Sequence, residues 1–147
     1  MAALVLGLDL YDYAGAGGAV IARAVAGQAD PWAFALKLAL TALCVAAGYR
    51  GGEIVPTLFI GATFGCVAAP LVGLAPGFGA CIGMIALFCA VVNCPVASLF
   101  LAAELFSTGE LAPFSVAVAV AYVLSGYVSL YSSQRTQFAK LGDRDRE

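Results

Sequence analysis

The sequence has no histidine and very little charge. Only 11% of its 147 residues are charged, against roughly a quarter in ordinary soluble domains. Catalysis by histidine is therefore excluded, and no other cluster of residues indicates an enzyme or a bound cofactor. The net charge of −2 also leaves no basic surface of the kind that binds nucleic acid, so we expect no nucleic-acid partner.

The cysteines form no recognisable metal or disulfide pattern. There are five, an odd number, and no two are spaced as a CxxC pair. They are Cys44, Cys66, Cys81, Cys89 and Cys94. All lie inside apolar segments, where a free thiol packs like a small apolar side chain. We therefore expect neither disulfides nor a metal site.

Apolar residues are abundant instead. They make up 63% of the chain, and the mean hydropathy is +0.97. A soluble fold of this size could not bury so much apolar surface. Residues 54–103 and 111–134 contain no charge, and about 20 apolar residues allow a helix to cross a bilayer. The sequence therefore predicts an all-α, polytopic membrane protein, which we expect in an inner or plasma membrane of bacterial type.

Glycine and proline repeatedly interrupt the apolar part of the chain. We expect a loop and a short helix in residues 1–30, the membrane domain in 31–133 and a charged cytoplasmic tail in 134–147. Asp30 is expected to cap the first membrane helix, with Pro31 in its first turn. The expected membrane helices cover about 32–47, 57–72, 78–92, 96–106 and 113–128.

The helix at 96–106 is expected to be too short to cross the membrane, at about 16 Å or half a bilayer. Short and broken helices survive in a bilayer only where protein buries their backbone or where they line a polar cavity. They are also the best sequence indicator of an ion or substrate site. Two glycine pairs, Gly61 with Gly65 and Gly79 with Gly83, have the spacing that permits close helix packing, and we expect them to serve packing alone.

The segment that carries chemistry is GGEIVP, residues 51–56. Two glycines allow the backbone to turn sharply and to approach a ligand closely. Pro56 suits the first turn of a helix, where its missing N–H is not needed. The N–H groups at such a helix start have no helical partner, and together with the helix dipole they can bind a small anion. This segment therefore predicts an anion site without an adjacent Arg or Lys.

Glu53 in this segment has two interpretations. An ionised carboxylate would repel an anion, but apolar surroundings favour the neutral carboxyl, which could donate a hydrogen bond to the anion. Alternatively, Glu53 forms an ion pair with Arg50 at the membrane edge. The sequence leaves both open.

Residues 52–56, followed by the glycine-containing apolar helix TLFIGATFG, resemble the third anion-binding signature (GxFxP) of the CLC chloride channel and transporter family. Residues 93–97, followed by SLFLAAELF, resemble the family's helix pair around its "AP…EM" segment. Residues 130–133 resemble the stretch that carries the family's central tyrosine. The likeness covers nearly all of residues 30–140 and implies the fold of the second inverted-repeat half of the family.

The resemblance also implies a set of site residues. The backbone donors of the family fall on Glu53 and Ile54, and its anion-contacting hydroxyl falls on Tyr131, which would otherwise be interpreted as an interfacial tyrosine. The implied anion site consists of Gly52, Glu53, Ile54, Val55, Pro56 and Tyr131. Helices near 95–106 and 113–128 match those that form the family's homodimer interface.

The halide is left open between chloride and fluoride. Ile54 stands where the family usually has Phe, and Glu within this motif is similar to the branch that exchanges fluoride for protons. A fluoride site needs compact hydrogen-bond donors, which a protonated Glu53 would supply. The resemblance therefore implies a CLC-type channel or proton-coupled antiporter, with halide, protons and the lipid bilayer as its partners.

The family's first signature and its second, which bears the gating glutamate, are absent from this sequence. We expect the chain to supply the C-terminal half of the anion pathway and not to transport alone, as a fragment, a split-gene partner or a decayed copy lacking its N-terminal half. A second interpretation is a non-transporting membrane assembly subunit. A third, weaker one is a small multidrug-type exporter, for which Glu104 is the only candidate intramembrane carboxylate.

Overall fold

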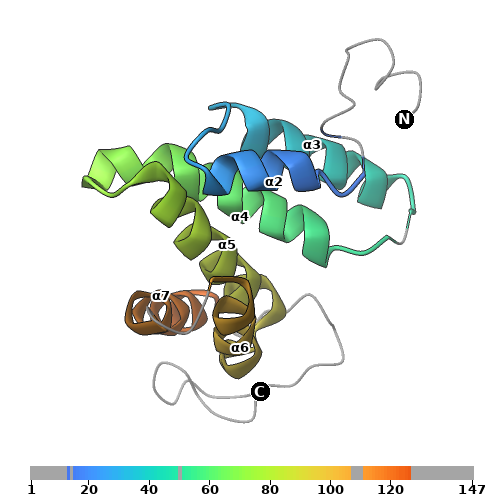
Figure 1. Ribbon diagram of the computed structural model, residues 1–147. Coiled ribbons are helices and arrows are strands. Elements are labelled where there is room, and N and C mark those ends of the chain that lie inside the picture. The colour runs from blue at the N-terminus through green and yellow to red at the C-terminus, as the bar shows by residue number, and fades with distance from the viewer. Residues whose placement is uncertain (1–12, 14, 50, 107–110, 127–147) are drawn as a thin grey trace, which may run out of the picture.

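The computed structural model describes residues 13, 15–49, 51–106 and 111–126, and all regular elements within them are helical (Figure 1). The predicted all-α fold is confirmed for this part of the chain. The elements are α2 (Gly18–Val25), α3 (Ala33–Ala46), α4 (Ile54–Ala68), the 3-10 helix η2 (Ala69–Val72), α5 (Pro76–Val92), α6 (Pro95–Phe106) and α7 (Leu111–Leu124).

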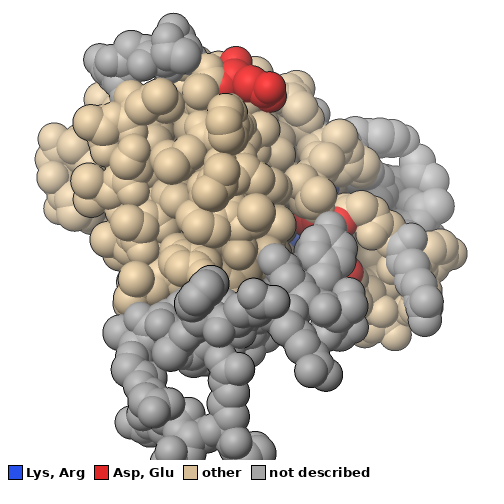
Figure 2. All heavy atoms as spheres, turned by 90° about the horizontal axis from the view of Figure 1, so that it is seen from below, with Lys and Arg blue, Asp and Glu red and all other residues tan. Residues whose placement is uncertain are grey.

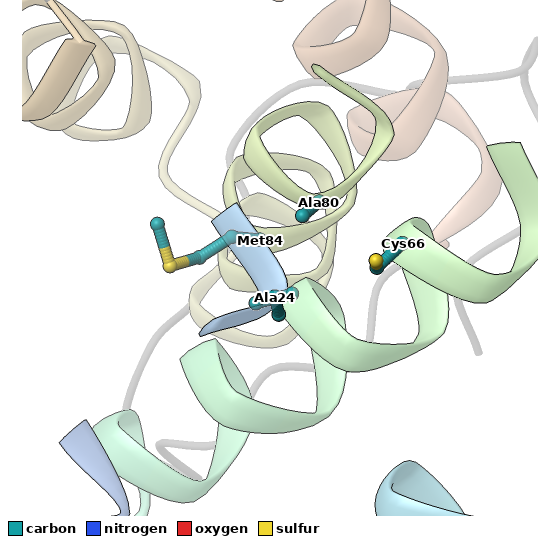
Figure 3. Packing of buried hydrophobic residues seen from close by; sticks show 5 residues of the cluster. Ala24, Cys66, Ala80 and Met84 are labelled. Atoms are coloured by element: carbon teal, nitrogen blue, oxygen red, sulfur yellow. The ribbon is translucent and has the colours of Figure 1, made fainter. Parts of the chain in front are cut away.

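Helix α5 connects two groups of helices. In Figure 1, α2 and α3 lie with α4 at one end of α5, whereas α6 and α7 lie at its other end. Ala24 of α2, Cys66 of α4 and Ala80 of α5 form one buried cluster (Figure 3). Further along α5, Ile85 packs with Phe114 of α7 in a second cluster. One apolar helix thus contributes to both cores.

The predicted helix starts are close to the observed ones, with one clear error. Asp30 does not cap α3, because the helix begins at Ala33 with Trp32 as its N-cap residue. The backbone first makes a separate turn, in which the Ala33 N–H donates to the Asp30 carbonyl at 3.0 Å. The Asp30 carboxylate accepts a 3.4 Å hydrogen bond from the Tyr13 hydroxyl instead.

The predicted breaks lie where the structure has them. Helix α5 ends at Val92, and its C-cap residue Asn93 adopts a left-handed conformation (φ 59°) that asparagine tolerates better than most residues. The next helix, α6, has 12 residues, or about 18 Å of length, so its predicted shortness is confirmed. The predicted turn at 107–110 lies outside the described residues, as does the tail at 134–147.

The crossing of α4 and α5 depends on the two predicted glycine pairs. A Cβ atom at Gly61 would lie 2.6 Å from the Gly83 carbonyl oxygen, and one at Gly79 would lie 2.6 Å from the Gly65 oxygen. Distances below 3.0 Å are essentially never seen for real Cβ atoms. The two backbones are therefore in direct contact, and the predicted packing role is confirmed.

Hydroxyl side chains in the helices bond to backbone carbonyls one turn earlier in the chain. The hydroxyls of Thr63 and Ser98 donate to the carbonyls of Phe59 and Cys94, one turn earlier, at 2.8 Å. Such bonds satisfy a hydroxyl without a partner helix, as an apolar environment requires. All five cysteines are free, and the described residues contain no group of acidic or cysteine side chains suited to a metal.

Much of the apolar surface is exposed. Figure 2 shows a face on which uncharged side chains predominate and acidic or basic ones are few. Among the described residues, one continuous helical stretch, Ile54–Val72, is long and apolar enough to cross a membrane by length and composition. Helices α3, α5, α6 and α7 are also apolar but shorter.

Candidate functional site

The site begins where α3 ends and the chain turns towards α4. Gly48 has a positive φ of 82°, and the Tyr49 N–H donates to the Cys44 carbonyl at 3.1 Å, which is the hydrogen bond of a Schellman cap. The sharp turn expected at Gly51 and Gly52 is thus made at Gly48. Gly51 and Gly52 have no positive φ, and a Cβ atom at either would meet nothing within 4 Å. Neither a positive φ nor close packing against described residues therefore requires glycine at these two positions.

The first backbone N–H groups of α4 are available to a ligand. Among the residues that the structure describes, no hydrogen bond is made by the N–H of Glu53 or Ile54. Pro56, in the first turn, has no N–H, and the first amide to donate within the helix is that of Thr57, to the Glu53 carbonyl at 3.2 Å. The helix start thus presents donors that no described residue accepts from, together with the positive end of its dipole.

Apart from Glu53, the side chains next to these amides are apolar and partly exposed. Ile54 and Val55 are each 39% exposed, Pro56 is half-buried and Gly52 is exposed. A surface of this kind does not supply hydrogen bonds that compete with the backbone donors. The arrangement can bind a small anion through N–H groups alone.

Glu53 is half-buried at the N-cap position of α4. Its carboxylate makes no hydrogen bond or ion pair within the described part of the chain, and its side chain does not cap the helix. Arg50, the partner in the alternative ion pair, lies outside the described residues. Tyr131 lies outside them too, so the structure brings together five of the six predicted site residues, 52–56.

Lys37 is a charged residue that sequence reasoning passed over. It is the only charge in α3, yet its side chain is only 4% exposed. Its ammonium donates to the carbonyls of Tyr13, at 2.8 Å, and Gly15, at 2.6 Å. It also lies 5.1 Å from the centre of the Phe59 ring in α4. The available signal was a single cation in an otherwise apolar helix, where charge is costly.

Glu104 does not resemble an intramembrane transport carboxylate. It lies near the end of the 12-residue helix α6 and is exposed. A carboxylate that carries substrate across a membrane faces the bundle interior or a water-filled cavity. Its position gives no support to the exporter interpretation.

Comparison with known proteins identifies the relatives of this chain. The family model described as voltage gated chloride channel matches residues 1–126. Over 134 residues, 90% of this chain, the sequence is 35% identical to a chloride/fluoride channel protein of Pseudomonas syringae pv. tomato (strain ATCC BAA-871 / DC3000). The crystal structure of a CLC-type fluoride/proton antiporter superposes on 92% of this chain with a TM-score of 0.83 and 34% sequence identity.

The chain spans only part of each relative, 29% of the Pseudomonas protein and 35% of the antiporter chain. The family model nevertheless matches most of the present sequence, and the solved structure has the same helical fold. The resemblance derived from residues 52–56 and from the order of the helices is thereby confirmed. This chain belongs to the voltage-gated chloride channel (CLC) family.

Proposed function

We propose that this chain forms part of the anion pathway of a CLC-type halide channel or proton-coupled antiporter. The observation that carries the proposal is the pair of amides at Glu53 and Ile54, which donate to no described residue and lie at the start of an uncharged helix. In this proposal the halide is held by Gly52, Glu53, Ile54, Val55, Pro56 and the Tyr131 hydroxyl. Membership of the family supports anion transport as the activity to test first.

Backbone donors suit a transport site because they bind an anion without a full opposite charge. Two amides and a helix dipole stabilise a dehydrated halide, whereas an adjacent Arg or Lys would hold it more tightly. An ion that must be released on the other side of the membrane needs a site of intermediate affinity. The exposed position of Ile54 and Val55 leaves room for the rest of the pathway to cover the ion.

We propose fluoride as the first halide to test, with chloride as the alternative. One relative is named a chloride/fluoride channel and the other a fluoride/proton antiporter. Glu53 could serve both ions of such an exchange, because the protonated carboxyl donates a hydrogen bond to the halide and the ionised one does not. Its carboxylate has no partner among the described residues that would prevent this role.

Replacement of Glu53 by glutamine tests this role. Glu53→Gln keeps the size of the side chain but removes its proton exchange, so we expect the fluoride-to-chloride flux ratio to change about tenfold. This corresponds to a change of about 1.4 kcal/mol in the difference between the transport barriers of the two ions. The measurement is halide efflux from vesicles containing protein produced from the complete gene, with all flanking coding sequence.

Glu104→Gln is the matched control, because it makes the same chemical change at an exposed acid on α6. It is expected to leave both fluxes unchanged. If Glu53→Gln had the same fluoride flux and the same chloride flux as the unmodified protein, Glu53 would not be part of the proposed site. Absence of halide flux in the unmodified protein would contradict the proposed function itself.

We further propose a multi-pass membrane location and a homodimer formed through α6 and α7. Both helices present large exposed apolar side chains, which need a partner or lipid to cover them. They are Val96, Phe100, Leu105, Val116, Val120 and Leu124. Because this chain spans about a third of its relatives, we also propose that further protein, corresponding to the missing N-terminal half, completes the pathway.

A further inference from the structure

The buried ammonium of Lys37 is not explained by the proposed anion site. Its side chain extends from α3 into the interior and is 4% exposed. It reaches two carbonyl oxygens of the segment before α2, those of Tyr13 and Gly15, and the face of the Phe59 ring. Phe59 itself is fully buried and also contacts the Tyr13 ring, at 5.9 Å between centroids.

These contacts satisfy the hydrogen-bonding needs of the ammonium but do not cancel its charge. An ammonium has three donors; two are taken by the carbonyls, and the remaining direction is open to the ring, a favourable partner for a cation. Within residues 13, 15–49, 51–106 and 111–126, none of its contacts is a carboxylate. The result is a fixed positive charge held by dipoles in an apolar environment.

This charge lies beside the helix that begins at the anion site. Phe59 is five residues after Ile54, the first residue of α4, or about 7.5 Å along the helix axis. At distances on the order of 10 Å, a unit charge in a protein interior still attracts an anion, because water is not there to screen it. An exposed charge at the same distance would have little effect.

We propose that Lys37 is a positioning residue of the anion pathway, whose fixed charge increases the affinity of the site at the start of α4 without touching the ion. This inference rests on the proposed function. A cation away from the binding amides raises the halide's occupancy of the pathway. Because only backbone donors contact the halide, the ion can still be released. The two carbonyls hold the ammonium in place, so that the cation does not bind the halide directly.

A purely structural role is the alternative, because the same contacts join α3, α4 and the segment before α2. The two roles differ in what they require of residue 37. A structural tie needs donors to the two carbonyls, whereas electrostatic attraction needs the charge. Variants that separate donors from charge therefore distinguish them.

The test compares Lys37→Gln, Lys37→Met and Lys37→Arg in protein produced from the complete gene. Gln keeps two N–H donors but has no charge. Met has neither N–H donors nor charge, and Arg has both donors and charge. Fluoride and chloride dissociation constants are measured by titration calorimetry, and thermal unfolding is measured in parallel. We expect the halide dissociation constant to rise about tenfold in Gln and Met, the factor for unit charges roughly 10 Å apart at an effective dielectric constant of about 20. Arg should stay within about twofold.

Arg23→Gln is the matched control, because it removes a positive charge from an exposed position in the last turn of α2. It should leave the dissociation constants unchanged. The proposal would be overturned if the Gln or Met variant folded and bound halide as tightly as the unmodified protein. It would also be overturned if neither variant folded while the Arg variant did, because Lys37 would then have a structural role alone. Absence of halide binding in the unmodified protein would instead refute the proposed function.

Discussion

Replacing the amide of Ile54 by an ester is expected to weaken halide binding about 10- to 100-fold. The change is made by incorporating the α-hydroxy acid that has the isoleucine side chain, so that only the N–H is lost. Hydrogen bonds to charged groups contribute about 1.5–3 kcal/mol, and this N–H has no other acceptor among the described residues. Titration calorimetry with fluoride and chloride measures the effect.

An ester at Thr57 is the matched control for this experiment. It lies in the first turn of the same helix, but its N–H already donates to the Glu53 carbonyl at 3.2 Å. Its loss is expected to reduce the free energy of unfolding by about 1 kcal/mol and to leave halide affinity unchanged. If the two esters weakened halide binding equally, the effect would come from helix stability, and the Ile54 amide would not be an anion ligand.

Gly61→Ala is expected to destabilise the protein by about 3 kcal/mol, at the upper end for an overpacked interior. The new methyl group would lie 2.6 Å from the Gly83 oxygen and 2.9 Å from the Met84 Cα, both backbone atoms. A side chain could rotate away, but a backbone can yield only if α4 and α5 separate. We expect an unfolding midpoint lower by about 6–12 °C.

A thiol-reactive maleimide dye provides the measurement, because unfolding exposes the buried thiols of Cys66 and Cys89. Gly18→Ala is the control. Gly18 is the first residue of α2, and a Cβ atom there would meet nothing within 4 Å. Its midpoint should not fall, since alanine favours a helix. If Gly61→Ala were as stable as Gly18→Ala, the backbones of α4 and α5 would not be in direct contact at Gly61.

The candidate anion site was predictable from sequence to the extent that it is local. The segment at 51–56 predicts a helix start with free amides, since Pro56 fits the first turn and lacks an N–H of its own. The exact first residue, Ile54, was not predicted, because the chain enters the helix through Glu53 in a helical conformation (φ −87°, ψ −14°). No residue pattern distinguishes a helix that begins at Ile54 from one that begins three residues later, at Thr57.

The prediction that Asp30 caps α3 was wrong for a different reason. Asp30 followed by Pro31 is a favourable helix start considered alone, but the Asp30 carboxylate meets the hydroxyl of Tyr13, 17 residues earlier. A contact between residues so far apart depends on how the segment before α2 packs on α3. Local preference therefore predicts that a helix begins nearby, and packing selects the residue.

The sequence by itself determined that this is an apolar, helical chain, where its helices break and which glycines allow two of them to touch. These properties depend on hydropathy, on proline and on the spacing of glycines, which involve residues close together in the sequence. Only the tertiary structure decided that α5 serves two cores and that the Lys37 ammonium bonds to carbonyls 22 and 24 residues earlier. Those contacts join residues distant along the chain, and a linear pattern does not encode which of them meet.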